Sequence, residues 1–94
     1  MALYLIGYDI SEKGEFTYQP LWDLLDTLGA VRILPSQLIV VGDTSRAGCI
    51  YGAVAALMQK EDRVLVQEIT KDVQCDKLLI SNEAFNKLLA NARD

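Results

Sequence analysis

The chain begins with a nearly continuous apolar run that ends on a single carboxylate. Residues 3–10 (Leu-Tyr-Leu-Ile-Gly-Tyr-Asp-Ile) have the length and composition of a β-strand. Side chains alternate between the faces of a strand, so one face carries Tyr4, Ile6, Tyr8 and Ile10 and the other carries Leu3, Leu5, Gly7 and Asp9. Both faces are largely apolar. Asp9 is the exception, because a charge beside such a run costs free energy unless it is paired or used.

The next apolar residues recur at helical spacing. After a polar, Gly-containing loop at 11–17, we expect a helix that reaches about Leu28. Pro20 fits its first turn, where a backbone N–H is not needed, and Gly29 is a natural C-terminal stop. The apolar face of this helix consists of Tyr18, Leu21, Leu25 and Leu28. The pattern therefore predicts one amphipathic helix directly after the first strand.

Two short strands, a second helix and another strand follow. Residues 31–34 and 37–41 are strand-like, and Pro-Ser at 35–36 favours a tight connection between them. Asp or Thr at 43–44 can cap the next helix. The apolar stripe of that helix consists of Ala47, Ile50, Tyr51, Val54, Leu57 and Met58. Residues 63–69 then complete the order strand, helix, strand, strand, helix, strand.

This order is the split β-α-β arrangement of ferredoxin-like folds. A doubly wound parallel fold would need a helix between Leu34 and Leu38, where the chain has no room for one. We therefore predict an α+β fold, a ferredoxin-like β-α-β-β-α-β sandwich, in a single domain over residues 1–94. Its core spans 1–69, and 70–94 form a C-terminal extension.

The extension is expected to add one strand and one helix. Residues 77–80 (Lys-Leu-Leu-Ile) suit a short fifth strand, and Ser81 or Asn82 can cap a final helix. The apolar face of that helix consists of Phe85, Leu88, Leu89 and Ala92.

The apolar second face of the sheet predicts an interface. A four-stranded sheet with two helices covers only one face with its own chain, and exposed apolar faces usually mark contacts between molecules. We therefore predict a homodimer that packs sheet against sheet or exchanges its tails. The alternative is a monomer whose final helix folds back over that face.

Composition narrows the function classes. The 94 residues are 51% hydrophobic and carry a net charge of −4, which is enough for a core and weighs against general nucleic-acid binding. No apolar stretch is long enough to cross a bilayer and no signal segment precedes the first strand, so we expect a cytoplasmic prokaryotic protein without membrane contact. The chain has no histidine, which excludes Ser-His and Cys-His nucleophiles. In a cytosolic protein Cys49 and Cys75 are expected to be reduced thiols, one of them buried in a helix, and without histidine to activate it neither is expected to be catalytic.

Asp9 is the residue on which a catalytic site would depend. If the open faces of two copies meet near the first strand, two Asp9 carboxylates approach each other and can share a divalent ion. With no imidazole available, that ion would be Mg²⁺ or Mn²⁺. The alternative is that Asp9 accepts hydrogen bonds from N–H groups of the following loop.

Two short motifs resemble the small CRISPR-associated endonuclease family, whose members are accessory subunits of spacer integration. They are Tyr8-Asp9 at the end of the first strand and, after the helix, Gly29 followed by Arg32 and Ser36. The resemblance implies a ferredoxin-like homodimer with metal-dependent nuclease activity on RNA or DNA. Asp9 would then be the catalytic and metal-binding residue, and Arg32 and Ser36 would bind nucleic acid.

The order of elements extends this likeness over residues 3–69. The chain looks closest to an uncharacterised SinR-like branch of the family. The virulence-associated protein D toxins, which are ribonucleases, share the architecture. Where the family has basic residues after its Asp, this chain has Ser-Glu-Lys-Gly-Glu at 11–15.

Residue chemistry leaves alternatives open for the remaining candidates. Ser36 follows a proline, which is typical of turns. Arg32 could bind phosphate, but an ion pair with an acidic neighbour such as Glu68 across the sheet is favoured. Arg46 could join a helix N-terminus as a third nucleic-acid contact, or be solvated. The competing functions are a Mg²⁺-dependent nuclease, a catalytically silent dimeric interaction module, and a small-molecule sensor.

Overall fold

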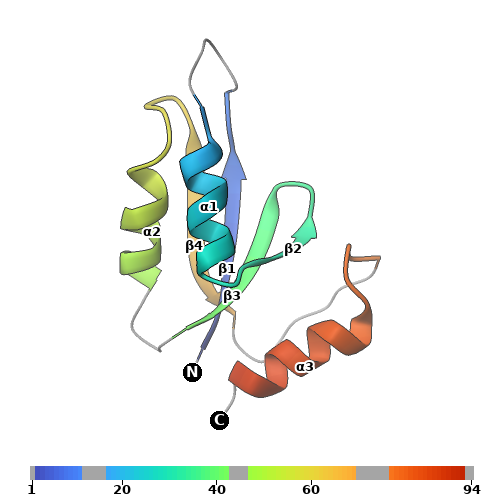
Figure 1. The fold of residues 1–94 in the computed structure, drawn as a ribbon. Helices are drawn as coiled ribbons and strands as arrows, with labels where there is room; N and C mark the ends of the chain where they lie inside the picture. Colours follow the sequence, from blue (N-terminus) through green and yellow to red (C-terminus); the bar gives the residue numbers. More distant parts are fainter. Residues whose placement is uncertain (1, 12–16, 43–46, 70–76, 93–94) are drawn as a thin grey trace.

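Four strands and three helices make up most of the residues that the computed structural model describes, which are 2–11, 17–42, 47–69 and 77–92. In chain order they are β1 (Ala2–Asp9), α1 (Gln19–Thr27), β2 (Val31–Leu34), β3 (Gln37–Gly42), α2 (Ala47–Ala55), β4 (Arg63–Ile69) and α3 (Asn82–Ala92). The protein is thus a small α+β domain, as predicted (Figure 1).

The strands form one antiparallel sheet in the order β2-β3-β1-β4. The chain leaves β1 through α1 and returns on β2, so that β3 lies between the two. It leaves β3 through α2 and returns on β4, so that β1 lies between those two. As a result, the end of β1 meets the start of β4, and Asp9 lies opposite Arg63.

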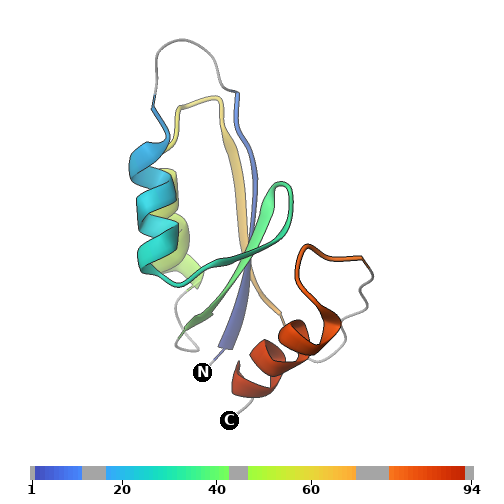
Figure 2. The same cartoon turned by 45° about the vertical axis from the view of Figure 1, so that its right-hand side comes forward.

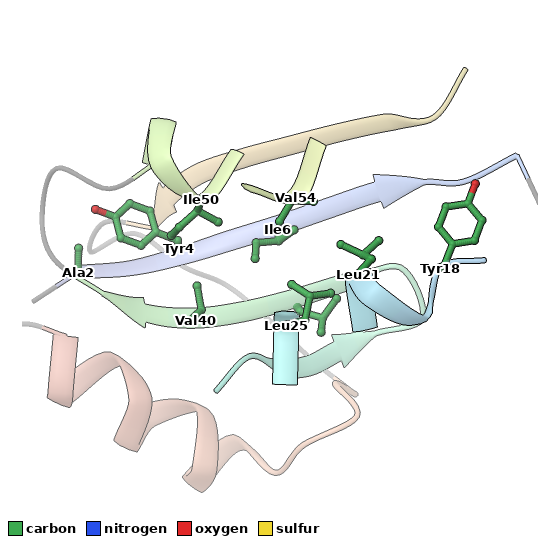
Figure 3. Close-up of a cluster of buried hydrophobic side chains, with 10 residues drawn as sticks. Ala2, Tyr4, Ile6, Tyr18, Leu21, Leu25, Val40, Ile50 and Val54 are labelled. Carbon is green, nitrogen blue, oxygen red and sulfur yellow. The ribbon is translucent and has the colours of Figure 1, made fainter. Parts of the chain in front are cut away.

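Helices α1 and α2 pack on one face of the sheet and enclose the larger core (Figure 2). Figure 3 shows the residues that the sheet and the two helices contribute: Tyr4, Ile6 and Val40 from the sheet, Leu21 and Leu25 from α1, and Ile50 and Val54 from α2. All of these side chains are buried. Alternate residues of β1 thus face the helices, and there they meet the apolar face of α1 that the sequence predicts.

Helix α1 ends at the glycine that the sequence marks as its stop. Gly29 has a φ of +74°, a left-handed conformation that side chains disfavour. Its N–H donates to the Asp26 carbonyl at 3.0 Å, and the N–H of Ala30 donates to the Leu25 carbonyl at 3.0 Å. This pair of hydrogen bonds is a Schellman motif, after which the chain continues directly into β2.

Helix α3 packs against part of the second face. Phe85 is 2% exposed and forms a smaller core with Leu3, Ile33 and Ile39. The Ala84 N–H donates to the Ser81 hydroxyl at 3.1 Å, so Ser81 is the predicted cap. This is the arrangement of the monomer alternative, although α3 leaves the Asp9 end of the face open.

Three details of the sequence prediction are wrong. Residues 77–80 form bends rather than a strand, and a single backbone bond of 2.8 Å from the Leu79 N–H to the Ile33 carbonyl links them to β2. Tyr51 is 50% exposed although it was expected in the apolar stripe of α2, because that helix buries a narrow face through Ile50 and Val54. Cys49, in the same helix, is exposed rather than buried.

Some predictions fall on residues outside the described ranges. These are the helix cap at 43–44, Arg46 and Cys75. In the part of the chain that the structure describes, no helix combines the length and the hydropathy that crossing a membrane requires.

Candidate functional site

Asp9 is the last residue of β1 and lies on the face opposite α1 and α2. Its side chain is 75% exposed, and it accepts no hydrogen bond from any described residue. The N–H of Ser11, which a loop-capping Asp9 would be expected to hold, donates instead to Asp62 at 2.7 Å. Ser11 therefore does not cap through Asp9, and the rest of that loop, residues 12–16, lies outside the described residues.

Arg63 is the nearest charged partner of Asp9. The two residues are paired across β1 and β4, and an Arg63 guanidinium nitrogen lies 3.9 Å from a carboxylate oxygen of Asp9. Both side chains are mostly exposed, so the ion pair contributes about 0–1 kcal/mol and opens easily. The sequence analysis did not single out Arg63. Arg63 could have been identified because it is the first residue of a strand that runs antiparallel to β1.

A shallow hollow of about 290 Å³ surrounds this pair. Its lining residues are Gly7, Tyr8, Asp9, Ser36, Gln37, Arg63, Val64 and Leu65. Gly7 lies between Gln37 and Leu65 in the sheet, and without a side chain it keeps the floor of the hollow low. The structure thus brings together Asp9 and Ser36, two of the predicted site residues.

The turn that carries Ser36 is held against the end of β1. The Tyr8 N–H donates to the Ser36 carbonyl at 3.1 Å, and the Tyr8 hydroxyl donates to the Pro35 carbonyl at 3.3 Å. Arg32 donates to the Tyr8 hydroxyl at 2.7 Å and also to the Pro35 carbonyl. These hydrogen bonds hold the turn at residues 35–36, which forms one edge of the hollow, in place against β1.

Arg32 itself lies on the other face of the sheet. It is paired with Leu38, and its guanidinium sits 5.8 Å from the ring centre of Tyr8 and 5.9 Å from that of Trp22. The favoured ion pair with Glu68 is wrong, because β2 and β4 form opposite edges of the sheet. Arg32 therefore does not reach the Asp9 hollow, and Arg46 lies outside the described residues.

A second carboxylate, Asp62, joins two loops, the one between β1 and α1 and the one between α2 and β4. It accepts hydrogen bonds from the Tyr18 hydroxyl at 2.6 Å and from the backbone N–H groups of Ser11 and Gln59 at 2.7 Å each. Desolvation raises the pKa of the Asp62 carboxyl, but these hydrogen bonds outweigh it and leave the pKa below its ordinary value. Asp62 is committed to structure, whereas Asp9 is the carboxylate that lines the hollow among the described residues.

The described residues of the chain do not include a complete set of metal ligands. Among the described residues, no group of three or more His, Cys, Asp or Glu side chains lies close enough to bind an ion. The Asp9 hollow offers one carboxylate with the hydroxyl of Ser36 and the amide of Gln37. Mg²⁺ takes six oxygen ligands, several of which are usually waters, and proteins usually hold it with one or two carboxylates, so Asp9 alone supplies the minimum.

No known protein-family model matches this chain.

Proposed function

We propose that the chain forms a homodimer of the CRISPR-associated or toxin nuclease type in a prokaryotic cytoplasm. In this proposal Asp9 is the catalytic residue for metal-dependent cleavage of RNA or DNA. The fold assigned to it is ferredoxin-like. Counted from its other edge, the sheet order becomes β4-β1-β3-β2 with every neighbouring pair antiparallel, which supports that assignment.

The observation that carries the proposal is the pairing of an open carboxylate with a guanidinium on an uncovered sheet face. Asp9 and Arg63 are 75% and 84% exposed at the end of the face that α3 leaves open. A carboxylate suits a hard cation, and a guanidinium suits a phosphate oxygen. Ser36, on the same hollow, adds a hydroxyl that can donate to phosphate.

The dimer adds a second carboxylate to that of one protomer. Leu65, beside Asp9 on the open face, is 55% exposed, which favours contact with a second copy there. Two copies would place two Asp9 side chains on one axis and provide the second carboxylate. A bound Mg²⁺ or Mn²⁺ would supply Lewis-acid stabilisation of a phosphoryl oxygen.

The test is a cleavage assay on single-stranded RNA and DNA with Mg²⁺ and with Mn²⁺. We expect Asp9→Asn to lower the rate by about a hundredfold or more, as loss of a catalytic group does. Asp23→Asn is the matched control, because Asp23 is an exposed carboxylate on α1, on the other side of the sheet. Equal rates for wild type and Asp9→Asn, or no cleavage by either, would contradict the nuclease proposal.

The second candidate is a catalytically silent dimeric interaction module of the same fold. It is favoured by the ion pair that partly neutralises Asp9 and by a net charge of −4 with nine basic residues. The same assay separates the two functions when the oligomeric state is measured beside it. A dimer that cleaves nothing, with or without Asp9, would assign the module.

A further inference from the structure

A second hollow lies on the opposite face of the sheet from Asp9, between the start of β2 and helix α1. It has a volume of about 240 Å³. Its lining residues are Trp22, Leu25, Asp26, Ala30, Arg32 and Leu38. The two leucines are buried and provide an apolar floor, while the other side chains are more accessible. One cation, one carboxylate and one indole thus converge on a single concave surface.

Arg32 lines this hollow with a charge that the described residues do not neutralise. Its hydrogen bonds run from one terminal nitrogen to two neutral acceptors, the Tyr8 hydroxyl and the Pro35 carbonyl. No carboxylate lies within ion-pair distance among the described residues. The other N–H donors of its guanidinium have no acceptor there, and the side chain is half-buried. A guanidinium in this state favours an anion that offers two oxygens.

The aromatic neighbours hold Arg32 in place and add a flat surface. The rings of Tyr8 and Trp22 have centres 5.7 Å apart, and the guanidinium carbon lies within 5.9 Å of each centre. Such contacts restrict the long side chain before any ligand arrives, which lowers the entropy cost of binding. Trp22 also lines the hollow, so its indole is available to a flat ring.

We infer that this hollow binds a small molecule in which a flat ring with an N–H donor is joined, directly or through a linker, to a phosphate or carboxylate group. Arg32 binds the anionic group, Trp22 stacks against the ring, and Asp26 accepts the N–H. Asp26 also disfavours anions that carry no donor, because its own charge lies on the same surface. The inference is independent of cleavage at Asp9, since the two hollows lie on opposite faces of the sheet.

Trp22 makes the inference directly measurable. It is the only tryptophan in the chain, so intrinsic fluorescence at its wavelength reports on this hollow alone. We expect saturable titration with adenosine monophosphate, with para-aminobenzoate, or with both, which identifies the anionic group. Adenosine and inorganic phosphate, each of which has only part of the required chemistry, are expected to bind at least about tenfold more weakly. Equal affinity for the parts and the whole would contradict the inference, as would no binding at all.

Variants then assign the contacts. Arg32→Gln should weaken binding by about tenfold or more, and Arg32→Lys, which keeps the charge but loses the fork, by less. Asp26→Asn should weaken only ligands that carry an N–H donor, such as the amino group of either probe, and because Asp26 is exposed this variant tests the site without disturbing the core. Lys87→Gln, an exposed cation on α3, is the control and should bind as wild type does. Unchanged affinity in both Arg32→Gln and Asp26→Asn would overturn the assignment.

Discussion

Asp62 holds the two loops beside the candidate site to one another. Its carboxylate joins the end of β1, the start of α1 and the connection between α2 and β4 through three hydrogen bonds. Gln59 extends the network, because its side-chain amide donates to the Tyr18 hydroxyl at 2.9 Å. The network therefore holds Ser11, after β1, and Tyr18, before α1, against the connection between α2 and β4.

The lowered pKa of Asp62 predicts a loss of stability in acid. In the unfolded chain the Asp62 carboxyl has a pKa near its ordinary value, about 3.9, and in the folded protein its pKa is lower. At pH values between these two pKa values the unfolded state therefore binds more protons than the folded state. The contribution of Asp62 is therefore complete above about pH 5 and is lost as the pH falls through its folded value.

The variant Asp62→Asn checks this linkage. We expect a lower melting temperature than wild type at pH 7, because the neutral amide cannot replace the charge-assisted bonds. The difference should shrink by pH 3, as measured by circular dichroism during thermal unfolding. Asp23→Asn, on the surface of α1, is the control. A difference between Asp62→Asn and wild type that is the same at both pH values would contradict the linkage.

Single residues also mark how far the sequence can predict the site. The exposure of Asp9 follows from its place at the end of an apolar strand, and that could be read from the sequence alone. The pairing of Asp9 with Arg63 depends on which strands are neighbours and on the register in which they pair, and side-chain alternation alone determines neither. The same missing information explains why the sequence favoured an Arg32–Glu68 pair between opposite edges of the sheet.

Among the elements, α3 is the one whose placement the sequence left open. Its periodic apolar face predicts a helix that packs on something, and its Ser81 cap predicts where it starts. The short run at 77–80 has the residues of a strand but not the backbone, since Lys77 has a φ of +57°. An apolar run of this length is ambiguous by pattern, and packing along β2 decides its conformation.

Phe85→Ala tests whether α3 belongs to the folded unit. Phe85 is 2% exposed in the core with Leu3 and Ile39, so its truncation should lower the free energy of unfolding by about 3–5 kcal/mol. Urea unfolding followed by circular dichroism measures it. Asn86→Ala, at the exposed neighbouring position of the same helix, should change stability little. A loss below about 1 kcal/mol for Phe85→Ala would mean that α3 is not docked on the sheet in solution.

At the scale of the whole molecule, the two faces of the sheet differ in how completely they are covered. Helices α1 and α2 bury alternate residues of β1 on one face, from Ala2 to Ile6. On the other face α3 buries Leu3, while Leu5 is half-buried and Asp9 is exposed. Coverage therefore decreases along β1 toward its end. Among the described residues of this face, the open part lies at that end, next to the Asp9 hollow, and the proposed second copy would bind there.

Leu65→Lys tests that placement of the dimer. Leu65 is 55% exposed beside Asp9. At a two-fold interface there, a lysine in its place would lie next to the same lysine of the second copy, and desolvation and charge repulsion would destabilise the dimer. We expect the wild type to sediment as a dimer and Leu65→Lys as a folded monomer in analytical ultracentrifugation. Tyr51→Lys is the matched control, because Tyr51 is 50% exposed on α2, on the opposite side of the sheet. A monomeric wild type, or a dimer that survives Leu65→Lys but not Tyr51→Lys, would place the interface elsewhere and remove the second carboxylate from the Asp9 hollow.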